Sequence, residues 1–155
     1  MARKKRYVYD YPRPAVTVDI AVVTTEKRPH VLLICRKNEP FAGKWALPGG
    51  FIEMDETLEA SARRELREET GIRARNMVEI GIFGDPGRDP RGRTISVVFL
   101  TRVARRSVRP VARDDAADVE WFPSDALPPL AFDHHWILEH PWIRVARRLP
   151  PFRKR

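Results

Sequence analysis

The stretch GGFIEMDETLEASARRELREETGI, residues Gly49 to Ile72, decides the structure that we expect around it. Asp55 and Thr57 are candidates for the N-cap of a helix, and Gly71 stands where a left-handed residue would end that helix. We therefore predict a helix over residues 57–70. Its apolar residues are spaced for one buried stripe, at Leu58, Ala62 and Leu66.

Three carboxylates share one face of this predicted helix. Glu65, Glu68 and Glu69 are spaced i, i+3 and i+4, which brings them within about one turn of each other. They lie in the last turns, where the helix dipole disfavours each anion by about 0.3 to 1 kcal/mol. A cation that neutralises them would explain this placement. Carboxylate oxygens select hard cations, and Mg²⁺ prefers a few carboxylates completed by water and phosphate oxygens. The pattern therefore indicates phosphate chemistry.

An ordinary salt-bridged surface helix is the alternative. Arg63, Arg64 and Arg67 interleave with the glutamates at spacings that allow ion pairs along the helix. From the helix alone, both interpretations stay open.

Length and composition indicate one domain. The chain has 155 residues, 43% of them hydrophobic, so we expect a single domain over 1–155 with a basic and aromatic arm at 1–13 and a basic tail at 150–155. The one cysteine, Cys35, excludes a disulfide framework or a cysteine zinc site and favours a reducing compartment. Because the N-terminus has no apolar signal-peptide region, we expect a cytoplasmic protein that does not enter a membrane.

The formal charge of +8 is concentrated at the two ends of the chain. Residues 1–13 carry +4 and residues 141–155 carry +6, so the body between them carries −2. Solvated tails explain this distribution more simply than polyanion binding does. We therefore do not expect nucleic acid as a partner.

Outside the central stretch, alternating and β-branched runs predict strands. They cover residues 15–24, 31–36, 77–83, 94–103 and 119–122. Residues 38–47 are predicted to be an irregular loop, and residues 132–149 a helix broken at Pro141. This alternation predicts a mixed sheet covered by helices, of the α/β or α+β class.

Two loops carry further candidate residues. Residues 84–93, GDPGRDPRGR, include Arg88 and Arg91, which could grip phosphates, although arginine-rich loops are often only solvated. Asp114 and Asp115 are adjacent in a polar loop, where turn chemistry alone would explain them.

From Gly50 onward the residues resemble a known motif. Gly50, Glu56 and the run Arg64 to Ile72 match the Nudix box, GX5EX7REUXEEXGU with U aliphatic, at every defined position. The resemblance implies the Nudix fold, a mixed β-sheet sandwiched between α-helices. It also implies hydrolysis of a nucleoside diphosphate linked to another moiety, with Mg²⁺ or Mn²⁺ as cofactor.

The same resemblance implies roles for single residues. Metal ligands would be the side chains of Glu65, Glu68 and Glu69 and the carbonyl of Gly49. Structural support would come from Gly50, Glu56, Arg64 and Gly71. The base that activates water is a box glutamate in some family members and a loop acid in others. Here these are Glu65 and Asp115, which stands six residues before Trp121.

Two softer segments indicate the substrate. Residues 85–92 (DPGRDPRG) and 130–138 (LAFDHHWIL) look like parts of short bacterial and archaeal ADP-ribose pyrophosphatases, and Pro86 or Pro90 matches a proline associated with that subgroup. We therefore expect hydrolysis of ADP-ribose to AMP and ribose 5-phosphate. Residues expected near the substrate are Arg88, Arg91, Phe132 and His135, where His135 could also simply be a polar residue at a helix start.

Other functions are compatible with the resemblance. One is a Nudix enzyme for NADH, a sugar nucleotide or a damaged nucleoside triphosphate. Another is a regulatory module without turnover, because the same two segments occur in Nudix-related transcription regulators that usually carry a DNA-binding domain after the Nudix part. Since the box is intact and the chain ends at Arg155, we expect an enzyme. Many relatives are homodimers, and the aromatic arm is compatible with a homodimer here.

Overall fold

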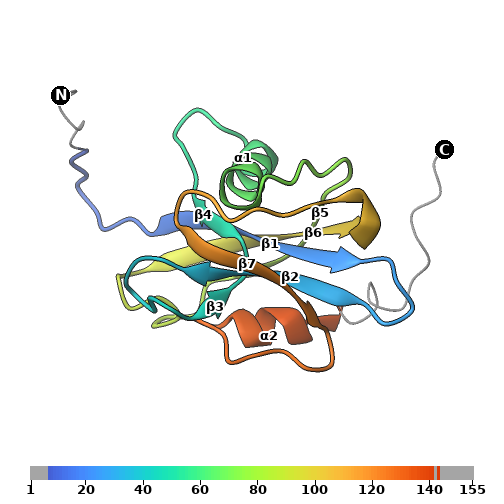
Figure 1. Ribbon diagram of the computed structural model, residues 1–155. Coiled ribbons are helices and arrows are strands. Elements are labelled where there is room, and N and C mark those ends of the chain that lie inside the picture. Colours follow the sequence, from blue (N-terminus) through green and yellow to red (C-terminus); the bar gives the residue numbers. More distant parts are fainter. Residues whose placement is uncertain (1–6, 142, 144–155) are drawn as a thin grey trace.

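The computed structural model describes residues 7–141 and 143, which form one mixed seven-stranded sheet with a helix on each face (Figure 1). The predicted α+β architecture is therefore confirmed. The elements are β1 (Ala15–Thr24), β2 (His30–Arg36), β3 (Trp45–Ala46), β4 (Gly49–Phe51), α1 (Leu58–Thr70), β5 (Val78–Phe83), β6 (Thr94–Val103), a 3₁₀ turn (Arg105–Ser107), β7 (Ala116–Pro123) and α2 (His134–Glu139).

The centre of the sheet is the parallel pair β1 and β6. Their register runs from Ala15 opposite Thr94 to Thr24 opposite Val103, and the strand order is β3-β2-β1-β6-β5. β7 pairs with β2, and β4 pairs with β1. Because the β-branched runs of β1 and β6 are apolar on both faces, the pair can be covered from both sides.

Alternate side chains of β1 belong to two separate hydrophobic cores. Ile20 and Val22 belong to the core beneath α1, which also contains Ala62 and Leu66 of that helix. Ala21 and Val23 belong to the core on the opposite face, with Ile137 and Leu138 of α2. Successive strand residues point to opposite faces, so one strand anchors both helices.

β4 carries the glycine pair to the centre of the sheet. It runs antiparallel to β1, with Asp19 opposite Gly49 and Val18 opposite Gly50. The Ile20 amide also donates to the carbonyl of Pro48 at 2.8 Å. These pairings place the start of the motif beside the last turns of α1.

Several predicted boundaries were wrong. The stretch 38–47 was predicted as loop only, yet it contains β3, and no strand was predicted at Gly49 and Gly50, which form part of β4. β7 begins at Ala116 instead of residue 119. Leu58 was predicted to be buried but is exposed, because it opens the first turn of α1.

The second helix begins later than predicted, at His134 instead of residue 132. It is interrupted at His140, next to the break predicted at Pro141, and Pro141 and Ile143 are again helical. The remainder of that prediction from residue 144 onward, the tail at 150–155 and residues 1–6 of the arm lie outside the described residues. Within the part of the chain that the structure describes, no helix has the length and apolarity needed to cross a membrane.

Candidate active site

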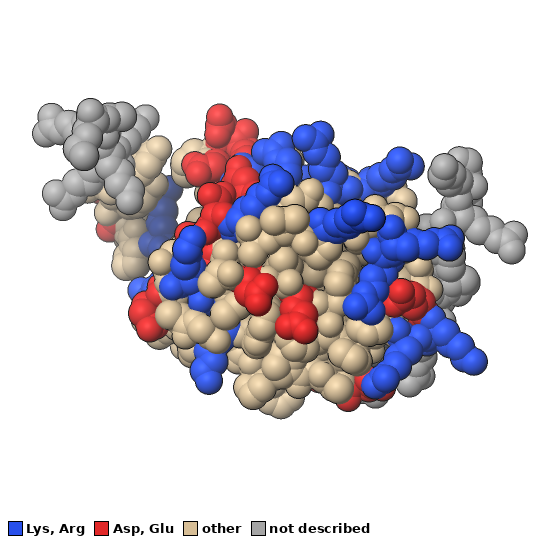
Figure 2. Space-filling view, in the orientation of Figure 1, with Lys and Arg blue, Asp and Glu red and all other residues tan. Residues whose placement is uncertain are grey.

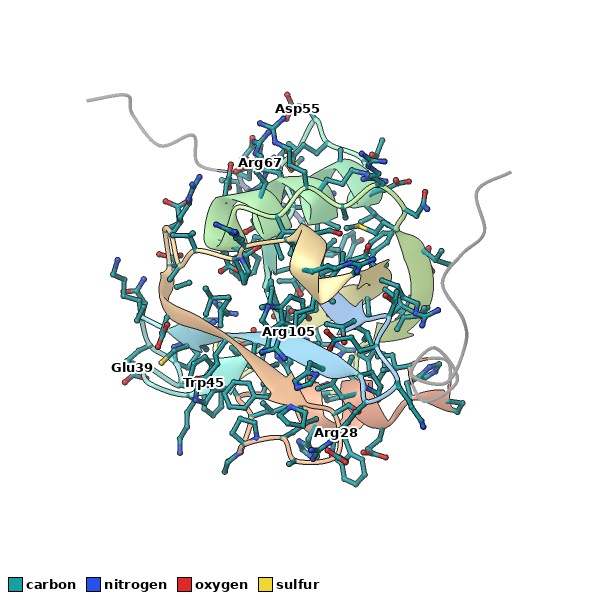
Figure 3. The ribbon with its side chains drawn as sticks, turned by 45° about the vertical axis from the view of Figure 1, so that its right-hand side comes forward. Arg28, Glu39, Trp45, Asp55, Arg67 and Arg105 are labelled. Atoms are coloured by element: carbon teal, nitrogen blue, oxygen red, sulfur yellow. The ribbon has the colours of Figure 1, made fainter. Side chains whose placement is uncertain are left out.

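The caps of α1 fix where its carboxylates point. The hydroxyl of Thr57 accepts from the Ala60 amide at 3.1 Å, and the Gly71 amide donates to the carbonyl of Arg67 at 2.9 Å. Gly71 has φ 74°, the left-handed conformation expected of a C-cap glycine. Asp55, the other N-cap candidate, lies at the outer tip of the loop before the helix, and Arg67 points away from the sheet (Figure 3).

A cavity of about 290 Å³ opens where α1, β4 and the loop before β7 meet. Glu65, Glu69 and Asp115 line it, together with Gly49 and Gly50. The structure therefore brings together acids that are 50 residues apart in sequence. On the visible face, acidic side chains gather over the loop before α1, whereas Lys and Arg cover the rest of that helix (Figure 2).

Glu69 is the most deeply buried of the three helix carboxylates, at 5% exposure. Its Oε2 accepts from the Gly49 amide at 2.9 Å, so it touches the glycine pair directly. Burial raises the pKa of Glu69 to about 8, against the lowering effect of that hydrogen bond. Glu65, Asp19 and Asp115 raise it further, and a cation in the cavity would reverse this unfavourable field.

Glu65 and Glu68 share one positive charge. Nη1 of Arg64 donates to Oε1 of Glu65 at 2.7 Å and to Oε2 of Glu68 at 3.1 Å. Burial raises the pKa of Glu65, and the contact with Arg64 opposes that rise. Glu65 lines the cavity, whereas Glu68 is held outside it on Arg64.

Arg64 also joins the loop before α1 to the helix. Its Nε and Nη2 donate to the Glu56 carboxylate at 2.8 and 3.0 Å, and Nη2 donates to the carbonyl of Phe51 at 3.1 Å. The hydroxyl of Ser61 donates to Glu56 as well. These hydrogen bonds lower the pKa of Glu56 to about 2. Glu56 and Arg64 thus link the loop before α1 to the helix.

The glycine pair permits a close approach that no other residue would allow. A Cβ on Gly49 would lie 2.2 Å from the carbonyl oxygen of Val18, and a Cβ on Gly50 would lie 2.6 Å from the Glu65 carboxyl carbon. Backbone and carboxylates can therefore face the same small volume.

The donor set suits a hard divalent cation that keeps water and substrate as ligands. Two carboxylates, Glu65 and Glu69, line the cavity beside Gly49, whose carbonyl is the expected third donor. Among the described residues, no three His, Cys, Asp or Glu side chains converge into a preformed metal cage. Mg²⁺ is commonly bound by one or two carboxylates plus substrate phosphates, so this set fits it.

Another wall of the cavity is basic and aromatic. The guanidinium of Arg91 lies 4.8 Å from the ring centre of Phe51 and 5.5 Å from that of Phe132. Arg36 lies 4.9 Å from the same Phe132 ring. Phe132 has φ 54°, which is unusual for a bulky residue and is held by an edge contact with Phe41. A ring between guanidinium groups is suited to an anionic, planar ligand.

Two predicted substrate residues are placed differently from expectation. Arg88 lines the cavity, but its side chain is only 5% exposed and donates to Asp133 at 2.8 and 2.6 Å. His135 is exposed and packs on Trp136, and it does not line the cavity. Instead His134, one residue earlier, lines it and is buried. Burial lowers the pKa of His134.

Sequence reasoning missed several lining residues. Asp19 carried a signal, because it is the single acid in the apolar run of β1. Arg36 and Asn38 carried none, since Arg36 is the last residue of β2 and Asn38 opens the stretch predicted to be loop. Asn38 donates to the Asp115 carboxylate at 3.0 Å and so orients the predicted loop acid.

Comparisons with known proteins agree with this geometry. The sequence model of the NUDIX domain family matches residues 13–141. An ADP-ribose pyrophosphatase from Methanocaldococcus jannaschii is 46% identical over 129 residues, which cover 83% of this chain and 73% of the relative.

Two further relatives are similar over most of the chain. The "ADPR responsive transcriptional repressor NtrR" from Acinetobacter baylyi is 36% identical over 88% of this chain, which spans 56% of the repressor's length. A crystal structure of the NUDIX domain of Shewanella oneidensis NrtR complexed with ADP ribose has a TM-score of 0.80 at 34% identity. That match covers 88% of this chain and 94% of the other.

Proposed function

The chain belongs to the Nudix family and is a Nudix hydrolase, and from this premise we propose that it cleaves ADP-ribose to AMP and ribose 5-phosphate with Mg²⁺. The relative from M. jannaschii carries the name of this activity, and the Shewanella domain binds ADP ribose. The observation that carries the proposal is that the cavity has two chemically different walls. Glu65 and Glu69 form an acidic wall for a cation, and Arg91 and Phe132 form a wall for the nucleotide.

Each wall has its own task in this proposal. Glu65, Glu69 and the Gly49 carbonyl would hold the metal, and Glu68, which is paired with Arg64, would be the further ligand. When bound, the metal neutralises the diphosphate and lowers the pKa of water. Arg91 and Phe132 hold the nucleotide end, and Arg36 reaches the phosphates from beside Phe132.

The hydrolysis needs one proton acceptor. Glu65 or Asp115 takes a proton from the attacking water, whose oxygen forms a bond to one phosphorus while the bond from that phosphorus to the bridging oxygen breaks. Both carboxylates line the cavity, and Asp115 is oriented by Asn38. The two products leave as AMP and ribose 5-phosphate.

A regulatory module without turnover is the second candidate, favoured by one observation. The repressor from A. baylyi is 36% identical to this chain, and its name describes a response to ADPR. Such a protein would use the same cavity for binding alone.

A nucleotide panel with and without Mg²⁺ separates these functions. AMP released from ADP-ribose is the expected result. Product from NADH, a sugar nucleotide or a damaged nucleoside triphosphate, with none from ADP-ribose, would show that the substrate is that nucleotide and not ADP-ribose. Tight binding of ADP-ribose without product would support the regulatory module.

For the assembly, we propose a homodimer in which residues 7–13 contact the second copy. Val8 and Tyr11 are 83% and 81% exposed on this segment, and Tyr7 stacks on Tyr9 at 6.3 Å between ring centres. Exposed apolar groups of this size favour an interface. Light scattering after size-exclusion chromatography would contradict this proposal by giving the mass of one chain.

The remaining partner and location proposals follow from charge and cysteine chemistry. We propose a small nucleotide as substrate and no nucleic-acid partner, because the net positive charge lies at the chain ends. Tight, salt-sensitive binding of a labelled oligonucleotide would contradict this. Cys35 is a free thiol, which is consistent with the cytoplasm as the compartment.

A further inference from the structure

A row of largely buried polar side chains, none of which belongs to the Nudix box, forms part of the cavity lining. His134 and Asp19 are 3% and 8% exposed, and the Arg88 side chain is 5% exposed. Nε2 of His134 lies 3.5 Å from Oδ1 of Asp19, and Nη2 of Arg88 lies 3.9 Å from Oδ2 of Asp19. Asp133 completes the row by accepting two hydrogen bonds from Arg88.

The row ends on the backbone of the segment that leads into β4. Nδ1 of His134 accepts from the Leu47 amide at 2.9 Å, in the buried interior. An accepting Nδ1 carries no proton, so the ring proton is on Nε2 and points toward Asp19. The Leu47 amide therefore fixes the tautomer of His134, and Asp19, which also accepts a hydrogen bond from Ser96, lies opposite the Nε2 proton with Arg88 as its counter-charge.

The segment from Leu47 to Gly49 is held by both helices at once. Pro48 has no amide hydrogen, so the segment has only two amide donors. The Leu47 amide goes to His134 on α2, and the Gly49 amide goes to Glu69 on α1. These helices lie on opposite faces of the sheet (Figure 1). The backbone beside the proposed metal site thus donates hydrogen bonds to two side chains, one from each face of the sheet.

We propose that His134 is a positioning residue for the metal, and that Asp19, Arg88 and Asp133 keep its ring in the required orientation. This inference rests on the proposed function of the cavity. His134 fixes Leu47, which fixes the direction of the Gly49 carbonyl two residues later. Outer-shell partners of this kind usually change metal affinity by about 10-fold to 100-fold when they are removed.

The inference also assigns Arg88 a different role from substrate binding. Its guanidinium is committed to Asp133 and Asp19 and is almost fully covered. Breaking that ion pair to reach a phosphate would leave the buried Asp19 and the partly buried Asp133 without this counter-charge, which is costly. Arg91 is more accessible, with 40% of its side chain exposed, although it too pairs with a buried carboxylate, that of Asp89, at 2.7 Å.

Matched variants of His134 test the proposal. In His134→Asn, Oδ1 takes the place of Nδ1 and can still accept from Leu47, whereas His134→Leu offers no acceptor. Three readouts on the full chain are the exchange rate of the Leu47 amide by NMR, the affinity for Mn²⁺ by EPR, and the kcat and KM for ADP-ribose. For His134→Leu we expect faster Leu47 exchange, Mn²⁺ affinity lowered about 10-fold to 100-fold, and a lower kcat with a smaller change in KM. His134→Asn should stay near the wild type.

Unchanged Leu47 exchange and Mn²⁺ affinity in His134→Leu would overturn the proposal. If that variant does not fold, His134→Gln decides, because Gln places its polar end at Nε2 and leaves Leu47 without an acceptor. Equal Mn²⁺ affinity of the Asn and Gln variants would then contradict the role. Exchange and Mn²⁺ binding do not require ADP-ribose turnover, so failure of the proposed substrate is distinguishable from failure of this inference.

Discussion

Arg64 grips the Glu56 carboxylate with two parallel hydrogen bonds, from Nε at 2.8 Å and from Nη2 at 3.0 Å, across eight residues of sequence. Its third nitrogen donates to Glu65, which lines the cavity. One guanidinium therefore couples the loop before α1 to the geometry of the site. Paired donors of this kind give direction as well as binding.

Replacing Glu56 by Gln should lower stability more at neutral pH than at low pH. Arg64 lowers the pKa of Glu56 to about 2 in the folded chain, below the ordinary value of 4.5. Because the unfolded chain binds the proton first, this stabilisation is present above about pH 4.5 and disappears as pH falls toward 2. Urea unfolding of both proteins at pH 7 and pH 3 measures it. An equal difference at both pH values would contradict the pairing.

Gly71→Ala should destabilise the protein by about 1 kcal/mol. Gly71 has φ 74°, a conformation in which a Cβ is unfavourable, and a Cβ there would find no closer atom than Arg113 at 3.7 Å. The cost therefore comes from the backbone and not from a clash. Gly71→Asn is the matched control, because Asn tolerates this conformation better. Thermal unfolding that ranked Asn below Ala would be incompatible with this explanation.

Changing each of the two glycines of β4 to Ala should affect the protein differently, one variant losing stability and the other losing activity. At Gly49 the new Cβ would meet the backbone oxygen of Val18 at 2.2 Å, so β4 must move and stability should fall by about 1 to 3 kcal/mol. At Gly50 it would meet the flexible end of Glu65, so the fold should persist while kcat drops. Unfolding curves and steady-state rates of both variants make the comparison. Full activity of Gly50→Ala would show that catalysis does not require the observed position of the Glu65 carboxylate.

Arg91→Ala should raise KM for ADP-ribose about 10-fold, the equivalent of about 1.4 kcal/mol, with little change in kcat. Its guanidinium lies between Phe51 and Phe132 at the nucleotide wall, away from the carboxylates of α1. Arg106→Ala, on the exposed 3₁₀ turn, removes the same charge elsewhere and serves as control. An unchanged KM in Arg91→Ala would remove this residue from the substrate site.

The sequence was sufficient for the long elements because their patterns are local. β1 and β6 were predicted to the residue, since ten-residue runs rich in β-branched residues leave few alternatives. α1 was predicted because both of its caps are residues with one main use, Thr57 and Gly71. β3 and β4 have two and three residues, too few for any periodicity, and exist only because β2 and β1 supply partners.

The candidate site residues on α1 could be predicted from the sequence, whereas the positions of those on the elements that face α1 could not. Spacing along one helix brought Glu65 and Glu69 together, but the approach of Asp115 depends on the pairing of β7 with β2. The choice between His134 and His135 depends on the phase of a helix of six residues, and His134, not the predicted His135, lines the cavity. A single Asp in the apolar run of β1 was the one signal for the buried row, because an unpaired charge in a core strand requires a partner.

The exchange Glu69→Gln tests the central claim most directly, because it keeps the shape of the side chain and removes its charge. Glu69 is buried against Gly49, and Gln can keep a hydrogen bond to that amide. AMP release from ADP-ribose should be measured over a range of Mg²⁺ concentrations, with circular dichroism to verify folding. The account predicts a folded protein whose metal-dependent turnover is lost. Turnover close to the wild type at the same Mg²⁺ concentration would contradict it.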